Sequence, residues 1–179
     1  PGRAYAAPDI HGFPNPVVIQ DRVIFVTFPS ARVYSVDKAT GEIHWTCELT
    51  GYGSPPRVFG NRIIVSTSKT LFAVDLSTGK IIWRFTPHTE AGEWFYSAPV
   101  KVKDSIFISD RKGFCYLLKI SSGKLIWKTK VTKGSDVNAA ALVAGDRIIT
   151  TTNEATAVAL KCTTGRLLWK SNIPSNATS

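Results

Sequence analysis

A thirteen-residue phrase that ends in tryptophan occurs four times along the chain. Each copy joins an apolar, strand-like run to a Ser/Thr-Gly turn and a second apolar run. The glycines of the four turns are spaced by 38, 44 and 42 residues. A repeat of this length predicts one supersecondary unit stacked on copies of itself. The copies are VYSVDKATGEIHW (33–45), LFAVDLSTGKIIW (71–83), CYLLKISSGKLIW (115–127) and AVALKCTTGRLLW (157–169).

A second shared segment precedes each phrase and aligns in all four copies without a gap. Its β-branched and aromatic runs are interrupted by a polar pair, such as Gly60-Asn61 or Gly145-Asp146, which is typical of a hairpin turn. Together the two segments predict four short antiparallel strands per unit, and no stretch has a sustained helical period. The predicted fold class is therefore all-β. The shared segments are 16–26, 56–66, 99–109 and 141–151.

A four-stranded meander of this length is typical of a β-propeller blade. The phrase aliphatic-aromatic-x-aliphatic-Asp-x-x-Thr-Gly-x-x-x-Trp resembles the repeat of pyrroloquinoline-quinone (PQQ)-like propellers. That family includes quinoprotein alcohol dehydrogenases and non-enzymatic relatives such as the outer-membrane assembly scaffold lipoprotein. The resemblance covers nearly the whole chain and implies a single propeller segment of four blades, at approximately 8–49, 50–90, 91–132 and 133–174.

The resemblance also implies a structural role for the marked residues of the phrase. The tryptophan corresponds to the family's docking tryptophan, which lodges between neighbouring blades. The glycine supplies a turn conformation that other residues resist, and the Ser/Thr and Asp beside it can bond local amides. Lys119 and Lys161 stand in place of this aspartate in the third and fourth copies. The residues with this structural role are Trp45, Trp83, Trp127, Trp169, Gly41, Gly79, Gly123 and Gly165.

Four blades are fewer than the ring of this family contains. An open array would leave apolar faces and strand edges uncovered at both ends. Three arrangements would cover them: the remaining blades of a longer chain, a homodimer that closes an eight-bladed ring, and a tight four-bladed ring, in that order of preference. The terminal segments 1–7 and 175–179 have the composition of linkers and lack capping features.

The chain carries 22 basic and 13 acidic residues, a formal net charge of +9. Such a charge raises the question of nucleic-acid binding. Basic residues of the third unit alternate with apolar ones, however, which favours the solvent-facing side of strands over a specific nucleic-acid surface. No apolar run is long enough to span a bilayer. These basic residues are Lys101, Lys103, Arg111, Lys112, Lys119, Lys124, Lys128, Lys130 and Lys133.

The three cysteines are Cys47, Cys115 and Cys162, which occupy unmatched positions of their repeats. There is no CxxC motif and no adjacent pair, so the sequence predicts neither a metal site nor a redox motif. Buried thiols are the favoured interpretation, and one disulfide remains open. The three histidines lie in different units without ligand spacing, and no catalytic motif is present.

Loops that lead into the innermost strands of a propeller line the funnel at one end of its channel. The longest of these loops here, PHTEAGEWFYSA (87–98), is rich in polar and aromatic residues. An elaborated loop on a rigid scaffold is a common location for a binding site. A loop that only covers the rim is an equally supported alternative. The candidate ligand-binding residues of the funnel loops are His88, Glu90, Glu93, Trp94, Tyr96, Asp136, Asn138 and Tyr52.

The dehydrogenases of the family imply a catalytic Asp, a Ca²⁺ ion held by carboxylate and amide oxygens, a tryptophan stacked under PQQ, and often a vicinal disulfide. Such oxygen ligands suit Ca²⁺. The vicinal cysteines are absent here, and only Glu93 or Asp136, with Asn138, are placed to approach a calcium ion. No catalytic residue and no cofactor is therefore predicted, and PQQ with Ca²⁺ enters only under the dehydrogenase alternative.

The predicted function is a non-enzymatic binding or scaffold module that holds a protein or small ligand through funnel loops or blade edges. Edge binding would add a strand of the partner to the outer strand of a blade. The alternative is part of a PQQ- and Ca²⁺-dependent quinoprotein dehydrogenase, and a sensor ectodomain is a weaker third interpretation. The resemblance implies an extracytoplasmic location, periplasmic or secreted.

Overall fold

The structure, a computed structural model, describes residues 15–87, 95, 98–133, 137 and 141–173. These residues form sixteen strands in four antiparallel sheets, each of four strands in chain order, so the all-β prediction is confirmed. The first blade contains β1 (Val17–Ile19), β2 (Arg22–Val26), β3 (Arg32–Asp37) and β4 (Ile43–Glu48). The second contains β5 (Arg57–Phe59), β6 (Arg62–Ser66), β7 (Leu71–Asp75) and β8 (Ile81–Phe85). The third contains β9 (Val100–Val102), β10 (Ser105–Ser109), β11 (Phe114–Lys119) and β12 (Leu125–Lys130). The fourth contains β13 (Leu142–Ala144), β14 (Arg147–Thr152), β15 (Thr156–Lys161) and β16 (Leu167–Asn172).

Tight turns join the strands at the positions that the repeat predicts. The first hairpin of each blade turns through a residue with positive φ, and this residue is glycine in the second and fourth blades. Gln20 and Lys103 adopt the same conformation in the other two, with φ of 52° and 54°. A residue with a side chain adopts positive φ at a higher conformational free energy than glycine does. These two positions are therefore locally strained, and the surrounding blade holds them in this conformation.

The outer strand of every blade has the same irregularity. The register between the third and fourth strands shifts by one residue just after the pair that contains the tryptophan, for example after the Ser35–Trp45 pair of the first blade. The other three blades repeat this shift. Such a bulge increases strand twist and reorients neighbouring side chains.

The hydrophobic core lies between the blades. One cluster of buried side chains joins the first and second blades, one joins the second and third, and one joins the third and fourth. Within each blade the two middle strands supply most of these side chains, as the burial patterns of β6 and β10 show. Each inner blade is therefore apolar on both faces and depends on its neighbours for stability.

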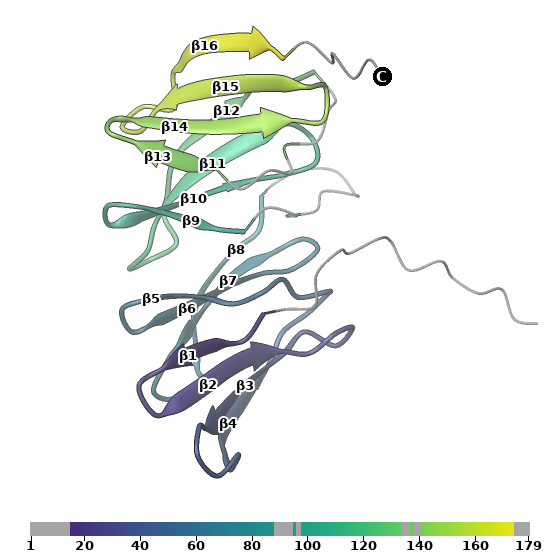
Figure 1. The fold of residues 1–179 in the computed structure, drawn as a ribbon, viewed down its shortest axis with the longest axis vertical. Helices are drawn as coiled ribbons and strands as arrows, with labels where there is room; N and C mark the ends of the chain where they lie inside the picture. Colours follow the sequence, from purple (N-terminus) through teal and green to yellow (C-terminus); the bar gives the residue numbers. More distant parts are fainter. Residues whose placement is uncertain (1–14, 88–94, 96–97, 134–136, 138–140, 174–179) are drawn as a thin grey trace, which may run out of the picture.

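Figure 1 shows the blades stacked in chain order along the long axis, with the first blade at the bottom and the fourth at the top. We call the end that carries the β1–β2 and β3–β4 turns and their equivalents the turn end. We call the opposite end, which carries the connections between blades, the loop end.

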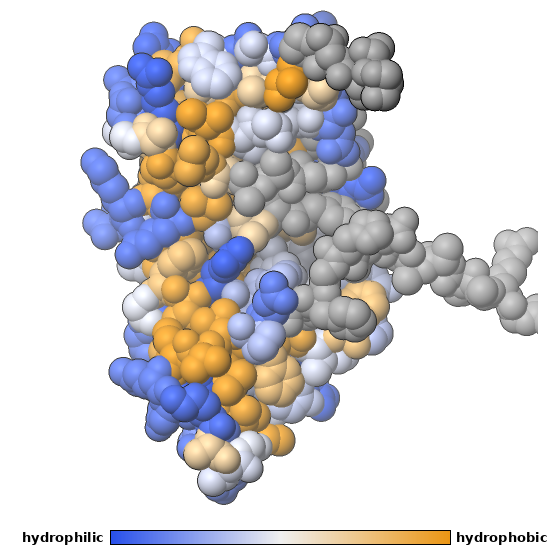
Figure 2. Space-filling view, viewed as in Figure 1, coloured by the Kyte–Doolittle hydropathy of each residue, from blue (hydrophilic) through white to orange (hydrophobic). Residues whose placement is uncertain are grey.

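On the face in Figure 2, apolar side chains gather over β1 and β13, where Val18 and Leu142 are exposed. Within the described ranges, no helix is long and apolar enough to cross a membrane.

Candidate functional site

Three of the four repeat tryptophans contact the next blade. In each case the indole lies against the Ser/Thr-Gly turn of that blade, and the indole N–H donates a hydrogen bond to a backbone carbonyl in it. The acceptor immediately follows the turn's first residue, Asp75, Lys119 or Lys161. The bonds are Trp45 Nε1 to Leu76 O (3.1 Å), Trp83 Nε1 to Ile120 O (2.8 Å) and Trp127 Nε1 to Cys162 O (2.9 Å).

The glycine of the receiving turn leaves room for the indole. A Cβ atom added at Gly123 would lie 2.6 Å from ring carbons of Trp83, and the same approach occurs at Gly79 and Gly165. Real Cβ atoms do not make such contacts, so the close approach of ring and backbone requires glycine here in addition to the positive φ. The repeat glycine therefore serves both the turn and the contact between blades.

The two ends of the array are different and complementary. Trp169 on β16 has no following blade among the described residues and is 38% exposed, whereas Trp83 is 9% exposed. At the other end, a Cβ atom added at Gly41 would have nothing within 4 Å. The fourth blade thus presents an uncovered tryptophan, and the first blade presents an uncovered glycine turn. Figure 1 shows the first and fourth blades at opposite ends of the stack, and no core cluster of the described residues joins them, so these residues do not form a tight four-bladed ring.

The aspartate of the repeat organises the turn in the first two blades. The carboxylate Oδ1 of Asp75 accepts hydrogen bonds from the amides of Ser77 and Thr78 and from the Thr78 hydroxyl. Burial acts to raise the pKa of Asp75, but these bonds and the charge of Arg62 outweigh it and lower the pKa. Asp37 has the equivalent bonds, chiefly from the Thr40 amide, and its pKa is also lowered.

Most of the predicted funnel residues lie outside the described residues: His88, Glu90, Glu93, Trp94, Tyr96, Asp136 and Asn138. Tyr52 is described and lies at the loop end between the first and second blades. Its ring stacks on Phe28 with a centroid distance of 5.5 Å. Both rings are exposed, at 43% and 45%. The structure thus places two aromatic side chains from different connections together at the loop end.

A buried carboxylate at the loop end of the third blade was not anticipated from the sequence. Asp110 is 1% exposed and follows β10. Its Oδ1 accepts hydrogen bonds from the amides of Lys112 and Phe114, and its Oδ2 accepts one from the hydroxyl of Tyr116 at 2.6 Å. Alignment of the repeats contains a signal for this site, because the other three blades have threonine at this position.

The described residues do not fit a calcium site. Both oxygens of the buried Asp110 carboxylate already accept hydrogen bonds within the blade. No group of three or more His, Cys, Asp or Glu side chains that could hold a metal ion occurs in the described part of the chain. The residues that the sequence offered for calcium, Glu93, Asp136 and Asn138, fall outside that part.

The cysteines and the basic residues of the third unit lie where the sequence predicted. All three cysteines are free and buried, and burial raises the pKa of the Cys115 thiol. Such a thiol is unreactive because it is protonated and inaccessible.

All nine basic residues of the third unit named above are exposed, in agreement with solvent-facing positions on strands and turns.

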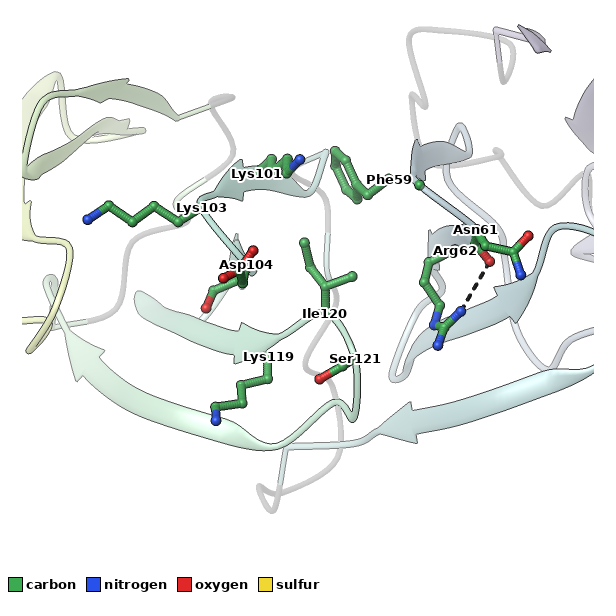
Figure 3. A pocket seen from close by; sticks show the side chains of 11 residues that line it. Phe59, Asn61, Arg62, Lys101, Lys103, Asp104, Lys119, Ile120 and Ser121 are labelled. Atoms are coloured by element: carbon green, nitrogen blue, oxygen red, sulfur yellow. Dashed lines mark hydrogen bonds between the residues drawn. The ribbon is translucent and has the colours of Figure 1, made fainter. Parts of the chain in front are cut away.

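A pocket of about 640 Å³ opens at the turn end between the second and third blades. Figure 3 shows that side chains of both blades line it, with Arg62 on one side and Lys103 and Lys119 on the other. Its wall also contains Phe59 and Ile120. We call it the turn-end pocket. The sequence analysis placed candidate ligand residues only at the loop end and missed this pocket, because its lining comes from separate repeats.

Comparison with known proteins identifies the family of this chain. The sequence profile of the family described as "Outer membrane protein assembly factor BamB" matches residues 6–179. The chain belongs to this family of PQQ-like propeller repeats. The predicted resemblance is therefore confirmed.

Curated members of the PQQ-like family include both enzymes and assembly factors. The chain is 30% identical to a quinoprotein ethanol dehydrogenase of Pseudomonas putida over 127 residues, 63% of this chain and 19% of that protein. It is 25% identical to the outer membrane protein assembly factor BamB of Legionella pneumophila (strain Paris) over 136 residues, 76% of this chain and 34% of that protein. The chain thus spans between about a fifth and a third of these relatives.

The solved structures agree on the fold. The crystal structure of BamB from Moraxella catarrhalis superposes with a TM-score of 0.73 at 22% identity, over 87% of this chain and 47% of that one. At this identity the likeness shows the fold alone. The chain is a PQQ-like propeller segment related to BamB and to quinoprotein dehydrogenases.

Proposed function

We propose that this chain is a non-enzymatic binding segment of a propeller scaffold, and that it recognises a protein partner at the loop end of its blades. The observation that carries the proposal is the exposed stack of Phe28 on Tyr52. Exposed aromatic rings held by a rigid scaffold are typical anchors of protein interfaces. The relatives named as outer membrane protein assembly factors support a scaffold role, and they support an extracytoplasmic location.

Site-specific photo-crosslinking tests this proposal. A photoreactive phenylalanine analogue replaces Tyr52 in the intact protein, and a matched variant carries it at Ile82, which is 38% exposed on β8. We expect the Tyr52 variant to form a covalent adduct with one defined protein and the Ile82 variant to form none. Equal adducts at both positions, or none at Tyr52, would contradict recognition at the loop end.

The end blades are proposed to bind further blades of the same kind, either from a second copy of this chain or from the remainder of a longer one. The three contacts between consecutive blades share one geometry, in which a tryptophan lies against the glycine turn of the next blade. Each end of the array carries one of these two partners, and this supports the proposal. Among the described residues, Trp169 has no glycine turn to contact, and the Gly41 turn has no tryptophan against it. A homodimer would satisfy both ends at once because each of its two interfaces pairs Trp169 with Gly41 of the other copy.

Sedimentation of the chain, with and without a change at Trp169, tests the homodimer. The homodimer predicts a species near twice 19.6 kDa, and loss of that species in Trp169→Ala. A monomer at all concentrations would exclude the homodimer and leave the longer chain as the source of the neighbouring blades. A dimer that Trp169→Ala leaves unchanged would contradict the docking geometry.

The alternative function is part of a PQQ- and Ca²⁺-dependent dehydrogenase, favoured by the identity of 30% to the Pseudomonas putida enzyme. The described residues offer no ligand set for it. Titration of the intact protein with PQQ in the presence and absence of Ca²⁺, followed by quenching of tryptophan fluorescence, separates the two functions. Saturable, calcium-dependent quenching would support the dehydrogenase, and its absence would support the scaffold.

A further inference from the structure

We propose that the turn-end pocket binds a small organic anion that carries at least two carboxylate or phosphate groups. This site goes beyond the function proposed above, since it lies at the opposite end of the blades from the Phe28–Tyr52 stack. Its volume of about 640 Å³ falls within the range of small-molecule sites, roughly 300–1,000 Å³. Three segments line it: the β5–β6 hairpin, the β9–β10 hairpin and the turn after β11.

The charge of the pocket is strongly positive. Four cationic side chains line it, and Asp104 is the one carboxylate among the described residues of the lining. Such an excess within one hollow attracts anions because the low-dielectric walls concentrate the field of the charges. The cations come from both blades, so a ligand between them would contact both walls (Figure 3). They are Arg62, Lys101, Lys103 and Lys119.

The fold leaves most of the hydrogen-bonding groups of these cationic side chains unused. None of the three lysine side chains donates a hydrogen bond or forms an ion pair within the described part of the chain, and all three are exposed. The guanidinium of Arg62 makes one long bond, of 3.4 Å, from Nη1 to the carbonyl of Asn61, and its Nε is buried without a partner. Hydrogen-bonding capacity is therefore available for carboxylate or phosphate oxygens.

The repeat pattern indicates that packing does not require lysine at these positions. Lys101 stands where the other three blades have valine, and Lys119 stands where the second blade has Asp75. At Asp75 the carboxylate accepts three hydrogen bonds that hold the turn, and a lysine cannot accept them. The third blade therefore loses a local stabilising element where it gains a positive charge in the pocket.

The apolar part of the lining restricts the ligand further. Phe59 and Ile120 are partly buried and pack against the core shared by the second and third blades. A ligand with a ring or hydrocarbon portion between its anionic groups would cover these side chains, whereas a bare inorganic ion would leave them in water. We therefore expect an aromatic polycarboxylate to bind more tightly than pyrophosphate does.

Calorimetric titration of the intact protein at physiological ionic strength tests the site. The probes are benzene-1,3,5-tricarboxylate, inorganic pyrophosphate and, as an uncharged control, benzyl alcohol. We expect the tricarboxylate to bind with a Kd below about 1 mM and the alcohol not to bind. Binding of pyrophosphate as well would place phosphate esters among the natural ligands, and tricarboxylate binding alone would indicate carboxylates. Binding of neither anion would overturn the proposal.

Charge variants distinguish the pocket from the general positive charge of the protein. Lys101→Glu and Lys119→Glu should each weaken tricarboxylate binding by about tenfold, since each replaces a charged donor with a repelling group. Lys161→Glu is the matched control, because it changes the same repeat position in the fourth blade, outside the pocket. Asp104→Asn should tighten binding. Equal weakening by Lys161→Glu, or weakening by Asp104→Asn in a variant that melts like the wild type, would refute the assignment.

Discussion

Replacement of Trp83 by alanine tests the central claim about stability, that contact between blades holds the array together. Trp83 is 9% exposed, its ring lies against Gly123, and its N–H bonds the carbonyl of Ile120 at 2.8 Å. Loss of a buried tryptophan ring costs about 3–5 kcal/mol. The variant would also leave the carbonyl of Ile120 without its hydrogen-bond donor, so we expect a loss of stability toward the upper end of this range.

The matched control is Trp169→Ala, which removes the same side chain from the same repeat position. Trp169 is 38% exposed and has no described neighbour blade, so its removal should cost less than half as much. For a chain of this size, 1 kcal/mol corresponds to roughly 2–4 °C in Tm, so a loss of about 5 kcal/mol in Trp83→Ala should lower Tm by about 10–20 °C.

Urea unfolding followed by circular dichroism, together with scanning calorimetry, measures both variants at concentrations where the chain is monomeric. Repeat arrays also unfold in parts when one interface is weakened. Trp83→Ala could therefore separate the transition into two steps, one for each half of the array. Equal destabilisation by the two variants would refute the argument that the contact with the following blade gives the tryptophan its stabilising effect.

The remaining predictions concern the turns and the thiols. Gly123→Ala should destabilise the fold by well over 1 kcal/mol, because the added Cβ atom would collide with the ring of Trp83. Gly41 also has positive φ, but its surroundings are open, so Gly41→Ala should show only the backbone penalty of about 1 kcal/mol. Equal losses of stability in urea unfolding would contradict the steric argument. Because hydrogen bonds lower the folded-state pKa of Asp75, its contribution to stability is complete above the ordinary value of about 3.9 and is lost as pH falls through the lower folded value. Asp75→Ala should therefore reduce the pH dependence of unfolding below about pH 4, and an unchanged profile would contradict this assignment. Cys115 should react with Ellman's reagent only at the rate of unfolding, and rapid labelling in the native state would show that its burial is wrong.

The local structure of each blade follows from short-range sequence. The Gly60-Asn61 pair predicts the β5–β6 hairpin because these residues tolerate positive φ, and the structure has that hairpin. Alternation of apolar and polar residues predicts strands with a buried face. The ligand residues at the loop end had weaker support from the sequence than the strands did, since the composition of a loop does not determine which of its side chains lie together. Of those residues only Tyr52 is described, and its stacking on Phe28 could not be predicted from either segment alone.

What the sequence by itself determined is the blade, its repetition and the family, because turn chemistry, strand alternation and the marked tryptophan are all encoded within a few neighbouring residues. Only the tertiary structure decided what the blades bring together. Lys119 in the third unit and Arg62 in the second line one pocket because the packing of one blade on the next sets the distance between their turns. The same packing covers Trp83 and leaves Trp169 exposed, although the two residues occupy the same place in the repeat. Burial and electrostatic potential depend on neighbours that are distant in the chain, so identical local sequence acquires different properties in different blades.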